Sequence, residues 1–167
     1  MRRLHLLLFL GAMLAAAGYV VATSAGLPAR VATHFGGSGA ADGWMTRAGY
    51  VRFMLLFIAV LPSALVAAIG LLPRLFPQWV NLPNRAYWLA PERREDSLDF
   101  LLAHACWFGV LIVLFMAAIH YLLLQANAAL PPRLPTVPFV ALLAAFVAGL
   151  AVLMVMLYRR FRLYPPR

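Results

Sequence analysis

The chain has 167 residues, of which 65% are hydrophobic and only 11% are charged, and its formal net charge is +9. Soluble domains carry about 25% charged residues, and a fold of this size cannot bury so much apolar surface. The composition therefore excludes an ordinary soluble domain. The arginines flank apolar runs and no nucleic-acid-binding motif is present, so we expect no nucleic-acid partner.

Apolar runs of about 20 residues, the length needed to cross a bilayer, lie at about residues 4–23, 50–72, 98–124 and 138–158. They predict an all-α integral membrane protein, a bundle of four transmembrane helices that forms one domain over residues 1–167. The first run exceeds the apolar core of a signal peptide, about 7–15 residues. We therefore expect an uncleaved anchor, with cleavage near the small residues 22–25 as the alternative.

The arginines predict the orientation, because cytoplasmic segments carry an excess of basic residues. With the N-terminus inside, the inner segments hold Arg2, Arg3, Arg74, Arg85, Arg93, Arg94, Arg159, Arg160, Arg162 and Arg167, and the outer segments hold Arg30, Arg47, Arg52 and Arg133. We expect both termini in the cytoplasm of a multi-pass protein. The outer loop is then the glycine-rich segment 24–49, and residues 73–97 form a cytoplasmic interfacial loop.

The segment 24–49 is the densest polar site in the sequence. Its residues 31–35 predict a short strand, a short hairpin is left open, and Asp42-Gly43 is a turn signal. We expect His34 to pair with Asp42, because a histidine held by a carboxylate is a candidate pH or ligand sensor. Phe35 and Trp44 are expected to fold back on apolar helix ends. The candidate ligand-binding or sensing residues are His34, Phe35, Asp42, Trp44, Arg47, Pro28 and Arg30.

Catalysis and metal binding are alternatives at this loop. Ser38, His34 and Asp42 supply the residue types of a hydrolase triad, but such triads are defined by geometry and no nucleophile elbow is present. His120 could approach His34 and Asp42 to hold a metal ion, and structural hydrogen bonds are the alternative that we favour. We predict no catalytic residue, no enzyme, no metal and no cofactor.

Two further histidines, His104 and His120, lie within the third apolar run. Histidine in a membrane span is rare and usually faces the protein interior. Both are candidates for proton or ligand contacts, and a hydrogen bond to a neighbouring helix is the alternative. Pro62, in the middle of the second run, predicts a kink because proline removes a backbone donor.

The segment 73–97 mixes both charges with aromatic residues. Trp79, Tyr87 and Trp88 are of the kind that lies at lipid headgroup level. Pro91 favours the start of a helix that continues into the third run and projects beyond the bilayer. The segment is either a cytoplasmic docking face or anionic-lipid clamp, or a solvated helix start with aromatic anchors. The candidate motif residues are Asn81, Pro83, Asn84, Tyr87, Trp88, Pro91, Glu92, Arg93 and Arg94.

The sequence Leu-Pro-Ala-Arg-Val-Ala-Thr-His-Phe at 27–35, followed by Gly39, Asp42-Gly43-Trp44 and Arg47, resembles the bacterial membrane domain of unknown function 1648. Arg47 stands where lysine is common in that domain. The domain also begins immunity and signalling proteins against the sporulation-delaying-protein toxin. The segment 81–94 resembles a second motif of stand-alone members, so the resemblance covers roughly residues 1–100. It implies a polytopic bacterial inner-membrane protein and supplies no reaction.

We therefore expect a membrane protein that binds or senses an envelope ligand, peptide or protein partner through its outer His-Phe loop. One alternative is a structural or accessory membrane subunit. The other is a small transporter component or a metal-assisted membrane enzyme. The lipid bilayer is the expected environment, and homo-oligomerisation is left open.

Overall fold

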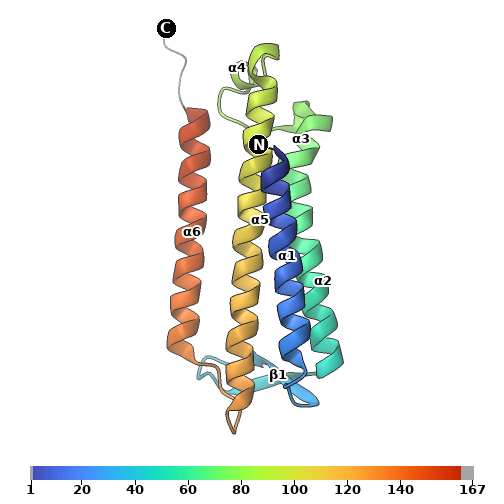
Figure 1. Cartoon of the computed structure of the whole chain (residues 1–167). Helices are drawn as coiled ribbons and strands as arrows, with labels where there is room; N and C mark the ends of the chain where they lie inside the picture. The colour runs from blue at the N-terminus through green and yellow to red at the C-terminus, as the bar shows by residue number, and fades with distance from the viewer. Residues whose placement is uncertain (1, 163–167) are drawn as a thin grey trace.

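The computed structural model describes residues 2–162. Within this range four helices are long and apolar enough to cross a membrane, at Arg3–Ser24, Arg47–Leu75, Pro91–Ala128 and Thr136–Arg162. They run alternately down and up as a bundle (Figure 1). This architecture confirms the prediction of a mostly helical, multi-pass membrane protein.

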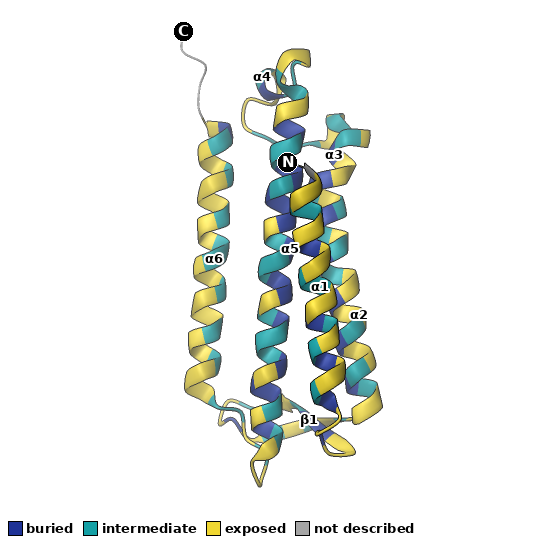
Figure 2. Cartoon of the chain, viewed as in Figure 1, coloured by how far each residue is buried: buried dark blue, intermediate teal, exposed yellow. Residues whose placement is uncertain are grey.

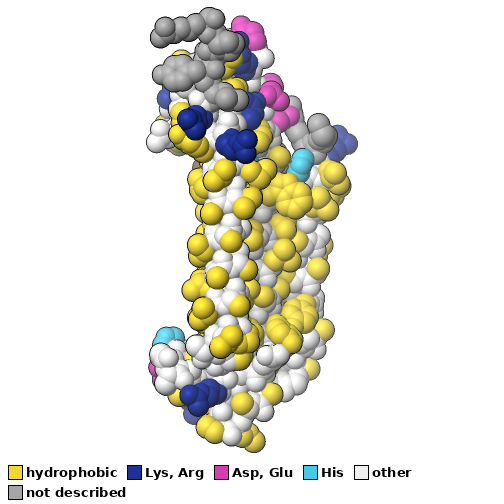
Figure 3. Space-filling view, turned by 90° about the vertical axis from the view of Figure 1, so that its left-hand side faces the viewer, with side chains coloured by type: hydrophobic (Ala, Val, Ile, Leu, Met, Phe, Trp, Pro, Cys, Tyr) yellow, Lys and Arg dark blue, Asp and Glu magenta, His cyan; other side chains and the backbone are white. Residues whose placement is uncertain are grey.

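The surface has the distribution expected of a bilayer-embedded bundle. Charged side chains gather at the two ends, and apolar side chains cover the length between them (Figure 3). Large apolar residues are exposed on every long helix, for example Leu14, Leu56, Leu114 and Val152 (Figure 2). Lipid tails solvate such surface at no cost, and the helices satisfy their own backbone hydrogen bonds.

Helix α5 (Pro91–Ala128) is the centre of the bundle. Helices α1 (Arg2–Ser24) and α2 (Arg47–Val66) pack against it around a core that includes Phe9, Ile58 and Val113. Gly109 permits this approach, because a Cβ there would lie 2.6 Å from a ring carbon of Phe9. Helix α6 (Thr136–Arg162) packs on α5, and its most apolar stretch has no buried residue.

Helix α2 continues through Pro62, the residue at which we expected a kink. The α-helical hydrogen bonding ends only after Val66. The π-helical segment η1 (Ala67–Leu71) follows, and then the short helix α3 (Leu72–Leu75). At η1, Gly70 passes so close to α5 that a Cβ would lie 2.7 Å from Leu102 Cδ1. The irregular turn therefore lies where the chain passes close to α5.

The two ends of the bundle differ. One end, which we name the hairpin end, carries the antiparallel strands β1 (Arg30–Phe35) and β2 (Ala41–Thr46). The other, the motif end, carries the 3-10 turn η2 (Pro77–Trp79), helix α4 (Arg85–Trp88) and the start of α5 at Pro91, as predicted. The turn expected at Asp42-Gly43 is wrong: both residues lie in β2, and the chain reverses at 36–39.

Candidate functional site

The hairpin turn is a four-residue segment rich in glycine. The Gly36 N–H donates to the Ala40 carbonyl at 2.9 Å, and the Gly39 N–H donates to the Gly36 carbonyl at 2.8 Å. Gly39 has φ +80°, a left-handed conformation that only glycine adopts without strain. Its carbonyl accepts the Leu134 N–H at 2.9 Å. The turn is thereby fixed to the connection between α5 and α6.

The side chain of Asn127, in the last turn of α5, fixes strand β1. Its amide donates to the Ala32 carbonyl at 3.0 Å, and its oxygen accepts the Ala32 N–H at 2.8 Å. It also donates to the Leu123 carbonyl at 3.0 Å. Ala32 is fully buried, so these bonds satisfy backbone groups that water cannot reach. This role of Asn127 was not predicted, and its signal in the sequence was an amide side chain shortly after an apolar run.

The expected pair of His34 and Asp42 is present. Their side chains join Nδ1 to a carboxylate oxygen across the hairpin, and they are 75% and 52% exposed. His34 lies opposite Gly43 in the strand register. A Cβ at position 43 would lie 2.7 Å from the His34 Cβ, so only glycine leaves room for the imidazole. The local sequence thus presents a polar pair that solutes can reach.

A cavity of about 400 Å³ adjoins this pair, between the hairpin, α5 and α6. His34 and Phe35 line it from β1, Ile119 and Leu122 from α5, and Phe139 from α6. Phe35 is half-buried here, in line with its expected position against apolar helix ends. The arrangement offers an apolar chamber with one ionisable pair beside it, which suits binding of a ligand that is apolar with a polar end.

The other predicted hairpin residues lie apart from the pair. The Arg47 guanidinium donates to the carbonyls of Ala25 and Leu27 at 2.9 and 3.0 Å, at the end of the hairpin away from its turn. It therefore fixes the chain after α1, and the structure does not bring it into a cluster with His34 and Asp42. Trp44 is 43% exposed, where we expected it to fold back. Pro28 and Arg30 are exposed.

His120 is fully buried and joins three helices. Its Nε2 lies 2.7 Å from Thr23 Oγ1, and its Nδ1 lies 2.6 Å from the Tyr50 hydroxyl. Thr23 donates its own hydrogen to the Tyr19 carbonyl at 2.7 Å. Thr23 therefore accepts from Nε2–H, and Tyr50 donates to Nδ1. The ring contacts helix neighbours rather than the exposed pair.

No group of three or more histidine, cysteine, aspartate or glutamate side chains within residues 2–162 is placed to hold a metal ion. The metal site that we considered, made of His34, Asp42 and His120, is not formed. The ring of His120 is hydrogen-bonded to Tyr50 and Thr23 instead. The remaining span histidine, His104, is buried on α5. It stacks on Phe100 with ring centroids 5.8 Å apart.

At the motif end, Trp88 attaches α6 to the bundle. Its indole N–H donates to the Phe161 carbonyl at 3.0 Å, and Ser97 donates to the Trp88 carbonyl at 2.8 Å. The Arg160 guanidinium lies 4.5 Å from the Trp88 ring centroid and pairs with Asp96 at 2.5 Å. Trp88 is only 8% exposed and packs with Leu98 and Phe161, and its place at lipid headgroup level stays a prediction.

The other motif residues shape the segment before α5. Asn84 has φ 53°, which asparagine tolerates better than most residues, and its carbonyl accepts the N–H groups of Tyr87 and Trp88 in α4. Tyr87 is half-buried under Arg93, whose guanidinium lies 4.0 Å from the ring centroid. Arg94 is half-buried. Exposed residues complete the set: Asn81, Pro83, Pro91 and Glu92.

Fold and site together define a multi-pass membrane protein whose helix bundle is closed at one end by a docked hairpin. Residues 7–61 match the model of the family described as Domain of unknown function (DUF1648), which confirms the resemblance seen in the sequence. The match spans most of α1, the hairpin and α2 as far as Leu61, and the segment 81–94 lies outside it. No curated protein and no solved structure matches the chain.

Proposed function

We propose that the chain is a binding protein, not an enzyme, that captures an apolar peptide segment at its hairpin end. The observation that carries the proposal is the exposed pair of His34 and Asp42 beside the cavity of about 400 Å³. Binding sites typically have about this volume, with apolar walls and a few polar groups that set orientation. Apolar side chains of the peptide enter the cavity, and its polar end hydrogen-bonds the pair.

The hairpin end faces the envelope side of a bacterial inner membrane in this proposal. Arginine is concentrated at the motif end, which supports a cytoplasmic location for that end. Arg167, which entered the same count, lies outside the described residues. A ligand of the hairpin therefore arrives from outside the cytoplasm.

The hydrogen bonds of the hairpin favour binding over hydrolysis. A serine nucleophile needs a histidine nitrogen facing its hydroxyl. The Ser38 hydroxyl instead accepts the Ala40 N–H at 3.4 Å. Among the hydrogen bonds of the described residues, none joins Ser38 to His34.

The finer role that we propose is immunity to, or sensing of, an envelope peptide. Its support is the likeness of the hairpin segment to the domain that begins toxin-immunity and signalling proteins. Gene neighbourhood distinguishes the two readings. A neighbouring toxin operon favours immunity, and a neighbouring repressor gene favours signalling.

Binding of a dansyl-labelled leucine hexapeptide to the purified chain in lipid nanodiscs tests the proposal. Val140 lines the cavity from α6, whereas Val137, three residues earlier, is exposed outside it. We expect Val140→Trp to abolish binding because the indole fills the cavity, and Val137→Trp to leave it unchanged. His34→Ala should weaken binding with little change in thermal stability. Equal binding by both tryptophan variants would refute the cavity as the site.

A second candidate function is that of a structural subunit, and the surface of α6 favours it. Most of this helix faces outward, with Val147, Val155 and Tyr158 among its exposed residues. A membrane partner or a second copy could cover that face. Disulfide crosslinking in membranes of a Val147→Cys, Cys106→Ser variant tests it. A crosslinked dimer together with absent peptide binding would support the subunit role, whereas monomers throughout would exclude self-association through this face.

A further inference from the structure

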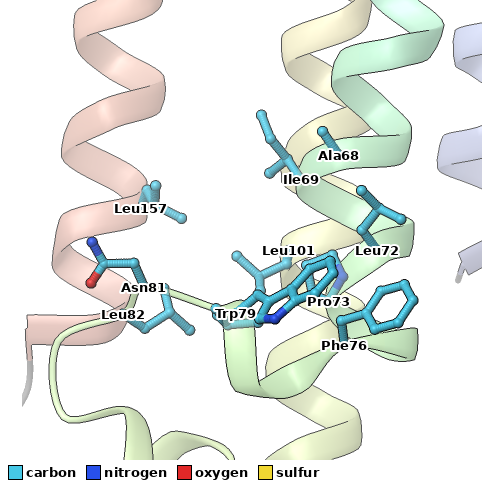
Figure 4. Close-up of a pocket in the computed structure, with 11 residues that line it drawn as sticks. Ala68, Ile69, Leu72, Pro73, Phe76, Trp79, Asn81, Leu82, Leu101 and Leu157 are labelled. Carbon is cyan, nitrogen blue, oxygen red and sulfur yellow. The ribbon is translucent and has the colours of Figure 1, made fainter.

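Two cavities meet at the 3-10 turn η2 of the motif end, because Trp79 lines one and Pro77 and Gln78 line the other. The first is an apolar groove of about 320 Å³ between α6 and the η1–α3 segment, with Leu101 of α5 between them (Figure 4). Ala68 and Leu72 line one wall, and Leu157 lines the other. Trp79, which is 70% exposed, lies across the groove beside Phe76. An exposed tryptophan between apolar and charged surface marks the headgroup level of a bilayer.

The second cavity, also of about 320 Å³, is polar and basic. Gln78, Arg85, Leu89 and Arg94 line it, and both of its charged lining residues are arginines. One nitrogen of Arg85 donates to the Gln78 carbonyl at 2.8 Å, which holds the guanidinium next to η2. The Arg94 Nε is shielded from solvent and has no hydrogen-bond partner among the described residues. A buried donor without a partner is costly and points to an acceptor that binds there.

Three carboxylates of the motif end pair with arginines other than Arg85 and Arg94. Arg74 pairs with Glu95 and Asp99, and Arg160 pairs with Asp96. None of these acids lines the basic cavity, whose positive charge is therefore uncompensated by its own walls. A phosphate group suits two arginines, because the guanidinium matches its oxygens with paired N–H donors.

We propose that the motif end binds one anionic phospholipid from the surrounding leaflet. Its phosphate and acidic headgroup lie in the basic cavity against Arg85 and Arg94, and one acyl chain lies in the apolar groove beside Ala68 and Leu157. A bilayer lipid has the charged head and apolar tail that the adjoining cavities require, and basic pockets between transmembrane helices bind such headgroups. The site is independent of peptide binding at the hairpin end.

The charge requirement is tested by native mass spectrometry of the full chain in detergent, with phosphatidylglycerol or phosphatidylcholine added. We expect tighter binding of phosphatidylglycerol. Arg85→Gln with Arg94→Gln should weaken it about 30-fold, about fivefold for each arginine. Arg159→Gln with Arg162→Gln removes the same two charges from exposed positions that line neither cavity and should change affinity less than about twofold. Equal affinity for both lipids, or equal effects of these variants, would overturn the proposal.

The tail requirement is tested separately, because the arginine variants could disturb folding. Ala68→Trp fills the groove with both arginines intact, and Ala64→Trp places the same indole one turn away on the outer surface. We expect Ala68→Trp alone to lose phosphatidylglycerol. Inorganic phosphate should not raise the thermal stability of the wild-type chain as the lipid does. If phosphate alone matches the lipid, or Ala68→Trp binds normally, the site holds a free anion or nothing specific, and the lipid proposal is wrong.

Discussion

At the scale of single residues, the position of His34 depends on neighbours that carry no charge. Gly43 leaves space for its side chain, and Asn127 holds the backbone of β1 at Ala32. Gly39 gives the turn its left-handed residue and accepts the Leu134 N–H. The exposed pair is thus mounted on a hairpin that is hydrogen-bonded to α5 and to the α5–α6 connection.

Gly43→Ala tests the close approach to His34. The new methyl group would lie 2.7 Å from the His34 Cβ, so the strands must separate or the imidazole must leave Asp42. We expect a loss of about 2 kcal/mol in the free energy of unfolding, typical of overpacking. Gly37→Ala is the control, since a Cβ there meets nothing within 4 Å. Thermal unfolding in detergent measures both, and an equal effect would contradict the steric account.

Asn127→Ala tests the clamp on β1. The Ala32 N–H and carbonyl would lose their partner while they remain buried, which costs about 2 kcal/mol. Amide hydrogen exchange should rise across residues 30–46. Gln125→Ala removes an exposed amide from the same helix end, where it bonds Tyr121, and should leave exchange unchanged. Unaltered exchange in the Asn127 variant would show that the hairpin stands without the clamp.

At the scale of elements, the apolar runs predicted the long helices because lipid-facing and core-facing residues are both apolar. The start of α5 followed from Pro91, which suits a first helical turn. The hairpin turn was misplaced, because Asp42-Gly43 and the glycines at 36–39 carry equally strong local signals. Gly39 is needed for its positive φ in the turn, and Gly43 is needed because the His34 side chain lies against it. Contacts between the two strands decide these roles, and a local sequence pattern does not contain them. The roles of Asn127 and Trp88 arise from partners distant in the chain, which no local pattern reveals.

The segment 77–97 at the motif end holds the end of α6 in place through Trp88. Trp88→Ala tests this contact. The substitution removes the bond to the Phe161 carbonyl and the ring that contacts Arg160. Among the long helices of the described chain, α6 packs mainly on α5, so we expect faster hydrogen exchange across residues 156–162. Trp79→Ala removes an indole of the same segment that is largely exposed and stacks on Phe76, and it should leave α6 protected. If the amides of residues 156–162 stay protected from exchange in both variants, α6 packs on the bundle without the contact to Trp88.

At the scale of the whole molecule, the two ends have different chemistry. The hairpin end combines an apolar cavity with the exposed pair of His34 and Asp42. The motif end combines ion pairs, arginine–aromatic contacts and a basic cavity. The buried bonds of His120 to Tyr50 and Thr23 join α1, α2 and α5 near the hairpin. The bundle therefore has a buried hydrogen-bonded junction of three helices near one end and a charged surface at the other.

Membrane orientation is the prediction that both proposals share. Because the four long helices of the described chain alternate in direction, the side on which one loop lies determines the side of every other loop. The arginine excess at the motif end predicts that this end is cytoplasmic. Alkaline phosphatase fused after Gly49 or after Arg133 should be active, and green fluorescent protein fused after Arg85 or at the C-terminus should fluoresce. Phosphatase activity after Arg85 with none after Gly49 would invert the protein, place the hairpin in the cytoplasm and remove the basis for an envelope ligand.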